Sequence, residues 1–399
     1  MREQTLDELF AEFEAQALPT FRPPGVPDAE RRLRSRPRRR RGLLAGVVAL
    51  LLAGPAGAYA MAGRNPDHPP NPTVTPRVVE RPISLPRGAG ALVQLQFIDG
   101  RHGWALFNTC SPGGPADGCR LTLARTGNGG VIWTWSDPLP GAPDAYLLPL
   151  DGRTLTVWDG QQYRVTTDGG TTETLHPPTA PPPATQRALA SRSGFLLACP
   201  STERASYGIP RNCQDEQLRL VRIDGTPVPR QPPMPLRGDL DVRVIEGGDG
   251  RLWLTVLDEG KLTVMVSADQ AVSWQALPAF DDVDQLLVSP DGRDVWLVGL
   301  DGPKPVRQLV DGRWQQRTGL PDDTKDVAAA GGGRLVVTSV HGGAGFWTDG
   351  GYTDLPELRE PTRSGGASVH VLRDGTILFA EGGAHIIATG TPGVWARIS

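Results

Sequence analysis

The residue types best suited to molecular recognition in this chain are grouped in one segment near its middle. Arg204, Tyr207 and Arg211 lie between Cys199 and Cys213. A tyrosine offers a flat amphipathic ring, and an arginine offers a fork of hydrogen-bond donors that fits a carboxylate. We therefore predict that these three residues contact a peptide, a glycan or a carboxylate, although similar residues also occur in surface loops that bind nothing.

The four cysteines form two local pairs, Cys110 with Cys119 and Cys199 with Cys213. An even number of cysteines at short spacings predicts two loop-closing disulfides in an oxidising compartment. A zinc site is the alternative, but the chain has no Cys-x-x-Cys motif and its six histidines are scattered. We therefore predict disulfides, no metal site and no cofactor.

The chain lacks the familiar short signatures of catalysis. It contains no Gly-x-Ser-x-Gly, no His-Glu-x-x-His and no Walker loop. Glycoside hydrolysis needs two carboxylates at a defined separation, which a sequence does not reveal. We assign no catalytic residue and predict a binding protein rather than an enzyme.

The elements that would position these residues repeat along the chain. Around Asp291-Gly292, two runs rich in β-branched residues flank a dipeptide that favours a tight hairpin turn. Related turns recur at intervals of roughly 42 residues, a period typical of repeat architectures. The two long intervals contain the cysteine pairs. The turns are Asp99-Gly100, Asp151-Gly152, Ser193-Gly194, Asp249-Gly250, Asp291-Gly292, Gly332-Gly333 and Asp374-Gly375.

A second turn precedes an aromatic position in three of the units, at residues 126–133, 166–173 and 267–274. These stretches resemble the Asp-box, or bacterial neuraminidase repeat, Ser/Thr-x-Asp-x-Gly-x-x-Trp, of sialidase-like β-propellers. They depart from the motif where Asn128 replaces Asp, Ala271 replaces Gly and Glu173 replaces the aromatic residue. The aromatic residues at the corresponding place, expected to pack between blades, are Trp133, Trp274, Trp314, Tyr352 and Trp395.

The resemblance implies an all-β fold, a seven-bladed β-propeller of four-stranded blades over residues 88–399. A strand containing Val78 and Val79 is expected to pair with the edge of the last blade and help to close the ring. The expected blades cover residues 88–140, 143–178, 186–235, 240–278, 281–318, 325–357 and 367–398.

The activity of the sialidases does not follow from the resemblance, because fold does not fix function. Sialidases use an Arg-Ile-Pro motif, three arginines for the substrate carboxylate and a Tyr/Glu pair. This chain has no Arg-Ile-Pro, and we assign it neither the arginines nor the pair. A sialidase-like glycoside hydrolase and a structural assembly factor remain the alternatives to a binding protein.

The N-terminal part has the pattern of a membrane anchor. We predict a cytoplasmic tail with a short amphipathic helix and an Arg-rich run over residues 1–41, which either docks a cytoplasmic partner or is a fluctuating tail that touches the membrane at times. We predict a transmembrane signal-anchor helix over 42–62, because an uncharged apolar segment follows the arginines. A cleaved signal peptide ending near Ala58-Tyr-Ala60 is the alternative. A Pro-rich stalk is predicted over 63–87, with the propeller outside the membrane.

Both cysteine pairs are expected between the second and third strands of their blades, and therefore on one rim of the ring. Elaborated connections on a regular scaffold usually carry binding sites. We therefore predict an extracytoplasmic protein or glycan ligand at this rim. Nucleic acid is not expected, because the chain beyond the N-terminal arginines is acidic overall.

Overall fold

The structure is a computed structural model in which the chain forms two compact units, Met1–Asn71 and Pro72–Ser399. The described residues are 75–84, 88–110, 118–142, 145–159, 161–177, 182–198, 217–359, 362, 366–381, 384–391 and 393–399. The predicted tail, the predicted transmembrane helix and most of the predicted stalk lie outside them. Within the described residues, no helix is long and apolar enough to cross a membrane.

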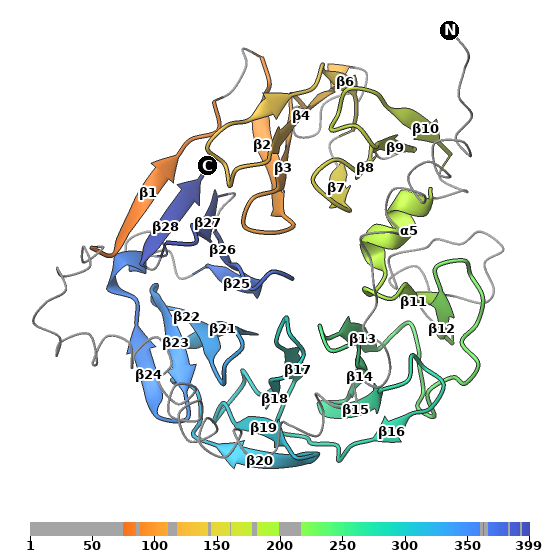
Figure 1. The fold of residues 1–399 in the computed structure, drawn as a ribbon, viewed down its shortest axis with the longest axis vertical. Helices are drawn as coiled ribbons and strands as arrows, with labels where there is room; N and C mark the ends of the chain where they lie inside the picture. The colour runs from red at the N-terminus through yellow and green to blue at the C-terminus, as the bar shows by residue number, and fades with distance from the viewer. Residues whose placement is uncertain are drawn as a thin grey trace, which may run out of the picture. The chain divides into compact units, whose positions relative to one another are not determined.

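The second unit forms seven sheets that follow one another around a ring (Figure 1). Blade 1 contains β2 (Ala91–Phe97), β3 (Gly103–Asn108), β4 (Arg120–Thr126), β5 (Thr134–Trp135) and β6 (Leu139–Pro140). Blade 2 contains β7 (Tyr146–Pro149), β8 (Leu155–Trp158), β9 (Tyr163–Thr166) and β10 (Thr174–His176). Blade 3 contains β11 (Phe195–Ala198) and β12 (Arg219–Arg222).

The remaining blades are regular four-stranded units, apart from one added strand. Blade 4 contains β13 (Asp241–Glu246), β14 (Leu252–Asp258), β15 (Lys261–Ser267) and β16 (Gln275–Ala276). Blade 5 contains β17 (Gln285–Val288), β18 (Val295–Val298), β19 (Val306–Val310) and β20 (Arg313–Arg317). Blade 6 contains β21 (Thr324–Ala329), β22 (Leu335–Ser339), β23 (Ala344–Thr348) and β24 (Gly351–Asp354), and a 3-10 helix, η4 (Pro356–Leu358), follows it. Blade 7 contains β25 (Ser368–Val371), β26 (Ile377–Glu381), β27 (Ala384–Ala388) and β28 (Val394–Ile398), joined by β1 (Arg77–Arg81). The predicted all-β architecture of seven sheets, consistent with a β-propeller, is confirmed.

Blade 3 departs from the expected four strands. Where a first strand was expected from residue 186, the chain forms α5 (Pro183–Leu189). Proline is well tolerated in the first turn of a helix, and the alanines and leucine that follow favour the helix. The helix packs on blade 2, where the Thr185 hydroxyl donates to the Thr156 hydroxyl at 3.2 Å. The two strands β11 and β12 pair with each other, with Ala198 opposite Arg219.

The hairpin turns take two forms. Gly194, Gly250, Gly292 and Gly375 have φ between +77° and +85°, as a tight turn through a glycine requires. In blades 1 and 2 the glycine has no such φ, and the aspartate orders the turn instead. Asp99 Oδ1 accepts from the backbone of the residues two and three positions later, both at 2.7 Å, and Asp151 does the same. Six of the predicted turns therefore take one of two local forms, and in the seventh Gly331, Gly332 and Gly333 have φ of +82°, +64° and +70°.

The ring closes through β1. This strand lies parallel to β28, with Val78 opposite Trp395 and Val79 opposite Ala396. On the other side, Arg81 Nη1 donates to the carbonyl of Gly129 in blade 1 at 2.6 Å. The expected closing strand is therefore confirmed, and it falls inside the stretch that we predicted to be stalk.

The core is divided among the seams between neighbouring blades. Second strands such as β3 and β18 are buried on both faces, because a blade lies against each face. Four tryptophans are almost fully buried in the strands: Trp104, Trp253, Trp296 and Trp347. Each blade is therefore stabilised chiefly by its neighbours in the ring.

We expect Val79→Asp to destabilise the fold by about 1–3 kcal/mol, because it places a carboxylate against the cluster of buried side chains between blades 7 and 1. Glu80→Gln, on the exposed side of the same strand, should change stability by less than about 0.5 kcal/mol. Urea denaturation followed by tryptophan fluorescence measures both. Equal effects of the two substitutions would contradict the role of β1 in closure.

His385 in β27 makes stability depend on pH. Its side chain is 9% exposed, and Nδ1 has no hydrogen-bond partner among the described residues. Burial, with a smaller contribution from His370, lowers the pKa of His385 to about 4. The unfolded chain therefore binds this proton more readily than the folded chain between about pH 6.5 and pH 4.

Stability from this group should be fully present above about pH 6.5 and should fall by up to about 3 kcal/mol as the pH approaches 4. We expect His385→Gln to flatten the profile in this interval, in urea denaturation at a series of pH values. An unchanged profile in the variant would show that other groups cause the dependence.

Candidate functional site

The first cysteine pair forms the predicted disulfide. Cys110 and Cys119 are bonded, with their Cα atoms 4.6 Å apart, and they lie on the connection from β3 to β4. This connection leaves the rim opposite the Asp99 turn, as predicted. We call this side the cystine rim and define it by the described residues 109–110, 118–119, 140–142, 159 and 161–162.

The other predicted site residues lie outside the described residues: Cys199, Arg204, Tyr207, Arg211 and Cys213. Their disulfide and their ligand contacts stay predictions. The strands that flank them are described, and Ala198 at the end of β11 pairs with Arg219 at the start of β12. These two strand ends therefore lie at the cystine rim, as the sequence predicts.

A cavity of about 400 Å³ opens at the cystine rim beside the disulfide. Arg120, Pro140 and Gly141 of blade 1 lie on one side of it, and Gln161 and Gln162 of blade 2 on the other. Cys119, Asp159 and Arg164 complete its lining. The cavity marks the end of the seam between blades 1 and 2 at this rim.

A nearly buried arginine holds two carboxylates at this seam. Arg164 Nε lies 2.7 Å from Asp159 Oδ2, and Arg164 Nη1 lies 2.9 Å from Glu173 Oε1. The side chains of Arg164 and Asp159 are 7% and 5% exposed, whereas that of Glu173 is 32% exposed. A buried pair needs further hydrogen bonds to offset its desolvation, and Asp159 Oδ1 accepts from the backbone of Gln161 and Gln162.

These contacts decide the charge state of Asp159. Burial acts to raise its pKa, but the backbone donors of Gln162 and Gln161 and the side chain of Arg164 outweigh it, and the pKa is lowered overall. The carboxylate therefore stays ionised beside its arginine near neutral pH. The charges of Asp159 and Arg164 are paired with each other inside the protein, which favours a structural role for this ion pair.

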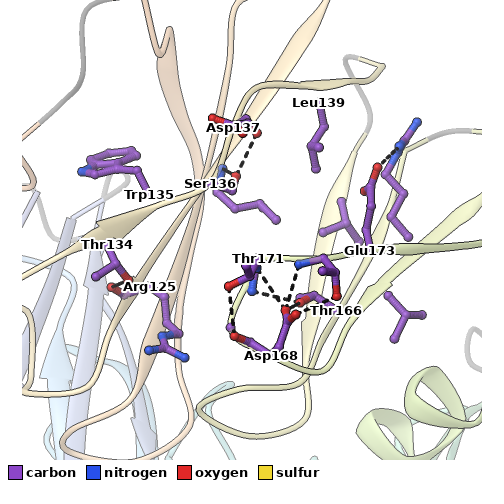
Figure 2. Close-up of a pocket in the computed structure, with 17 residues that line it drawn as sticks. Arg125, Thr134, Trp135, Ser136, Asp137, Leu139, Thr166, Asp168, Thr171 and Glu173 are labelled. Atoms are coloured by element: carbon purple, nitrogen blue, oxygen red, sulfur yellow. Dashed lines mark hydrogen bonds and ion pairs between the residues drawn. The ribbon is translucent and has the colours of Figure 1, made fainter.

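A second cavity, of about 530 Å³, lies along the same seam and shares Arg164 with the first. Figure 2 shows Ser136 and Leu139 of blade 1 across this gap from Thr171 and Glu173 of blade 2. Trp135 points away from the gap, and its ring centroid lies 5.3 Å from that of Phe107. Trp135 is the one aromatic residue in the described lining of this cavity, so no ring of that lining points into the gap.

Three turns between third and fourth strands share one hydrogen-bond pattern, and this explains which residue faces the gap. The hydroxyl of Thr126, Thr166 or Ser267 accepts from the backbone N–H four residues later, at 2.8 to 2.9 Å. The side-chain oxygen two residues after that hydroxyl accepts from another backbone N–H, at 2.9 to 3.0 Å. The residue seven positions after the hydroxyl therefore leaves each turn with equivalent local geometry: Trp133, Glu173 or Trp274.

At this position a tryptophan packs against the preceding blade. Trp133 contacts the cluster between blades 7 and 1, and Trp274 donates from Nε1 to the carbonyl of Arg230 in blade 3 at 3.0 Å. Trp314 and Trp395 occupy the seams between blades 4 and 5 and between blades 6 and 7. The predicted packing of these four is confirmed, whereas Tyr352 is 41% exposed.

Asp168 orders the turn of blade 2 beside the gap. The hydroxyl and the backbone N–H of Thr172 donate to it, as do Thr166 and the backbone of Thr171. These donors, Thr172 first, hold the pKa of Asp168 far below its usual range. Asp168 is therefore a fixed negative charge at the edge of the gap.

The channel at the centre of the ring holds a third cavity, of about 270 Å³, on the side of the hairpin turns. Arg192 of blade 3 crosses it, with Nη2 3.1 Å from the carbonyl of Pro290 and 3.5 Å from that of Arg373. Glu246 accepts from both the backbone and the hydroxyl of Ser193. Arg192 and Glu246 of this cavity thus join blades to each other.

The described residues offer little that would support catalysis or metal binding. In the described ranges, no group of three His, Cys, Asp or Glu side chains is placed to hold a metal ion. The described lining of the channel cavity includes two arginines and one glutamate but no tyrosine. Of the three cavities described, the two larger ones, of about 530 and 400 Å³, lie along the seam between blades 1 and 2.

The sequence predicted binding residues in blade 3, which lie outside the described residues, and it did not indicate this seam. The usable signal was Glu173, which replaces the expected aromatic residue in an otherwise regular turn. A missing ring at a position that packs between blades leaves space there. Arg164 and Asp159 carried no comparable signal, because only the fold brings Glu173 to them.

Comparisons with known proteins give likenesses in fold only. No protein-family model matches the chain, and no curated protein matches it significantly. Among solved structures, YCF48 bound to a D1 peptide is 17% identical, with a TM-score of 0.33 over 62% of this chain and 90% of that chain. A puromycin hydrolase is 13% identical, with a TM-score of 0.42 over 77% of this chain and 53% of that one.

An acylaminoacyl peptidase from Pyrococcus horikoshii is 12% identical, with a TM-score of 0.44 over 77% of this chain and 51% of the peptidase. The chain thus spans about half the length of the hydrolase and of the peptidase. None of these likenesses bears on what this chain binds.

We expect Arg164→Met to destabilise the fold by about 3–5 kcal/mol, because it leaves the buried carboxylate of Asp159 without its cation. The double variant Asp159→Asn with Arg164→Met should recover most of that loss, since the asparagine still accepts from Gln161 and Gln162. Glu173→Gln should cost no more than about 1 kcal/mol. Thermal and urea denaturation measure all three, and a double variant as unstable as the single one would show that the ion pair itself stabilises the seam.

Proposed function

We propose that this chain is a membrane-anchored, non-enzymatic β-propeller that binds a protein or glycan ligand outside the cell. The ligand lies at the cystine rim, at the seam between blades 1 and 2. The observation that carries the proposal is the cavity of about 400 Å³ beside the disulfide; a second cavity, of about 530 Å³, lies along the same seam toward the opposite rim and shares Arg164 with it. Their volumes fall in the range of about 300–1,000 Å³ typical of ligand pockets.

The proposed location is supported by the sequence and by the disulfide. An apolar stretch follows an Arg-rich run, which favours an anchor with the propeller on the far side of the membrane. The Cys110–Cys119 bond fits an oxidising compartment. The stretch predicted as a transmembrane helix, 42–62, lies outside the described residues.

The resemblance to Asp-box propellers is supported by the shared hydrogen bonds of the turns at Thr126, Thr166 and Ser267. Those turns face the rim away from the disulfide and leave the cystine rim to the longer connections. A regular scaffold with one elaborated rim is typical of proteins that bind through loops.

A sialidase-like hydrolase is the alternative that the same resemblance implies. It would need several arginines free to hold a substrate carboxylate. Arg164 is paired with Asp159 and Glu173, and Arg192 is bonded across the central channel. The binding function is therefore the better supported of the two.

The proposal is tested by charge reversal on the two opposite rims. Arg120→Asp changes the cavity at the cystine rim, and Arg293→Asp changes a side chain on the hairpin-turn rim that is 85% exposed. The full chain is probed with a glycan array and a peptide library, both on intact cells and after solubilisation. We expect Arg120→Asp to weaken ligand binding by about tenfold or more, as the loss of one charge-assisted contact with the ligand does, and Arg293→Asp to leave it unchanged.

The two preparations separate the parts of the proposal. Binding by the solubilised chain but not by intact cells would contradict the extracytoplasmic location. Equal binding by both variants would contradict the assignment of the rim. Turnover of a fluorogenic sialoside by the wild-type chain would contradict the non-enzymatic function.

A further inference from the structure

The gap between blades 1 and 2 is the place of a missing aromatic ring. The turns at Thr126, Thr166 and Ser267 have the same hydrogen bonds, so the side chains seven residues later leave their blades in equivalent directions. In the other two turns that side chain is a tryptophan packed against the preceding blade. In blade 2 it is Glu173, and a cavity of about 530 Å³ is found there.

The walls of the gap retain the character of a ring-binding pocket. Leu123 and Val157 are 4% and 1% exposed and form an apolar base, and Leu139 adds to it. Thr134 and Ser136 line the blade 1 side with hydroxyl groups. An apolar base with a polar rim suits tyrosine and tryptophan, which join an apolar body to one polar atom.

Two guanidinium groups also line the gap. Arg164 is held by Asp159 and Glu173, and Arg125 donates to the carbonyl of Gly152 at 3.2 Å. Guanidinium groups favour the faces of aromatic rings. The chain uses this contact repeatedly: Arg222 over Phe195, Arg251 over Trp253, Arg307 over Phe280 and Arg334 over Phe346, with the guanidinium carbon 4.2 to 5.3 Å from the ring centroid.

The charge at the entrance favours a basic neighbour for the ring. The lining contains three carboxylates, Asp137, Asp168 and Glu173, against the two arginines. Arg164 is further neutralised by Asp159 behind it. The entrance is therefore negative overall, and it complements a lysine or arginine beside the inserted residue.

We propose that this gap is the docking site for an aromatic side chain of a protein partner, flanked by a basic residue, which takes the place that tryptophan occupies in other blades. The inference deepens the proposed function and rests on it, because it names the partner class for the seam. The ring-docking site is separate from the cystine-rim cavity, where a different part of the partner would bind.

The test uses a short peptide, acetyl-Gly-Lys-Trp-Lys-Gly-amide with 5-fluorotryptophan, titrated with the full chain and followed by fluorine NMR. Saturable binding is expected, with a loss of about tenfold or more when alanine replaces the tryptophan or glutamate replaces both lysines. A peptide without its ring that binds as well as the original would overturn the proposal.

Two substitutions of Glu173 separate the effect of filling the gap from the effect of removing the carboxylate. Glu173→Trp restores the missing ring from within the chain, whereas Glu173→Ala removes the same carboxylate without filling the gap. Peptide binding to Glu173→Trp should be about tenfold or more weaker than binding to Glu173→Ala. Thr134→Trp fills the gap from the opposite wall and should act like Glu173→Trp. A thermal melt of each variant confirms that it is folded.

The outcomes distinguish this inference from the proposed function. Wild-type affinity in folded Glu173→Trp, or an equal loss in Glu173→Ala, would overturn the ring-docking site. If the array ligand of the cystine rim still binds in an Arg120-dependent way, the proposed function stands and only the ring-docking site fails. If neither the array nor the peptide shows binding, both fall.

Discussion

Every sheet in this ring must bury both of its faces, and it can do so only against the sheets on either side. A four-stranded sheet alone would expose one or both apolar faces, which is why the second strands are rich in buried valine, leucine and tryptophan. The seams between neighbouring sheets therefore contain the core of the protein. They are also where the fold is most easily destabilised, because a side chain missing from one side of a seam is not replaced by another part of the protein. The disulfide, the buried ion pair and the closing strand all lie where this requirement is hardest to meet.

The seam between blades 1 and 2 contains the buried ring of Trp104 but lacks the second ring that a tryptophan after the fourth-strand turn supplies at other seams. At those seams the ring comes from the fourth strand or the turn before it. Here Arg164 joins two carboxylates, and the pair with Asp159 is deeply buried. Such a pair stabilises a fold less than apolar packing of the same volume, which is consistent with a site kept open at some expense of stability.

Much of the fold was predictable from the sequence because it depends on local chemistry. The Asp-Gly turns specify hairpins, their regular spacing gives the number of sheets, and Val78 and Val79 identify the closing strand. The helix α5 was missed because the repeat favoured a strand there, whereas Pro183 and the residues after it favour a helix. The candidate site was missed for another reason: Arg164, Asp159 and Glu173, all in blade 2, meet when β9 pairs with β8 and β10, and the single local signal was the absence of a ring at residue 173.

The strand β1 joins two roles in one segment. It is the first strand of the compact unit, and its backbone hydrogen bonds to β28 hold blade 7 to the start of the ring. Any pull on the chain before Arg77 is therefore borne by the bonds that keep the circle shut. A force on the chain before Arg77 that peels this strand away would break its pairing with β28 from Arg77 onward, and the contact of Arg81 with Gly129 at the far end of the strand would break last.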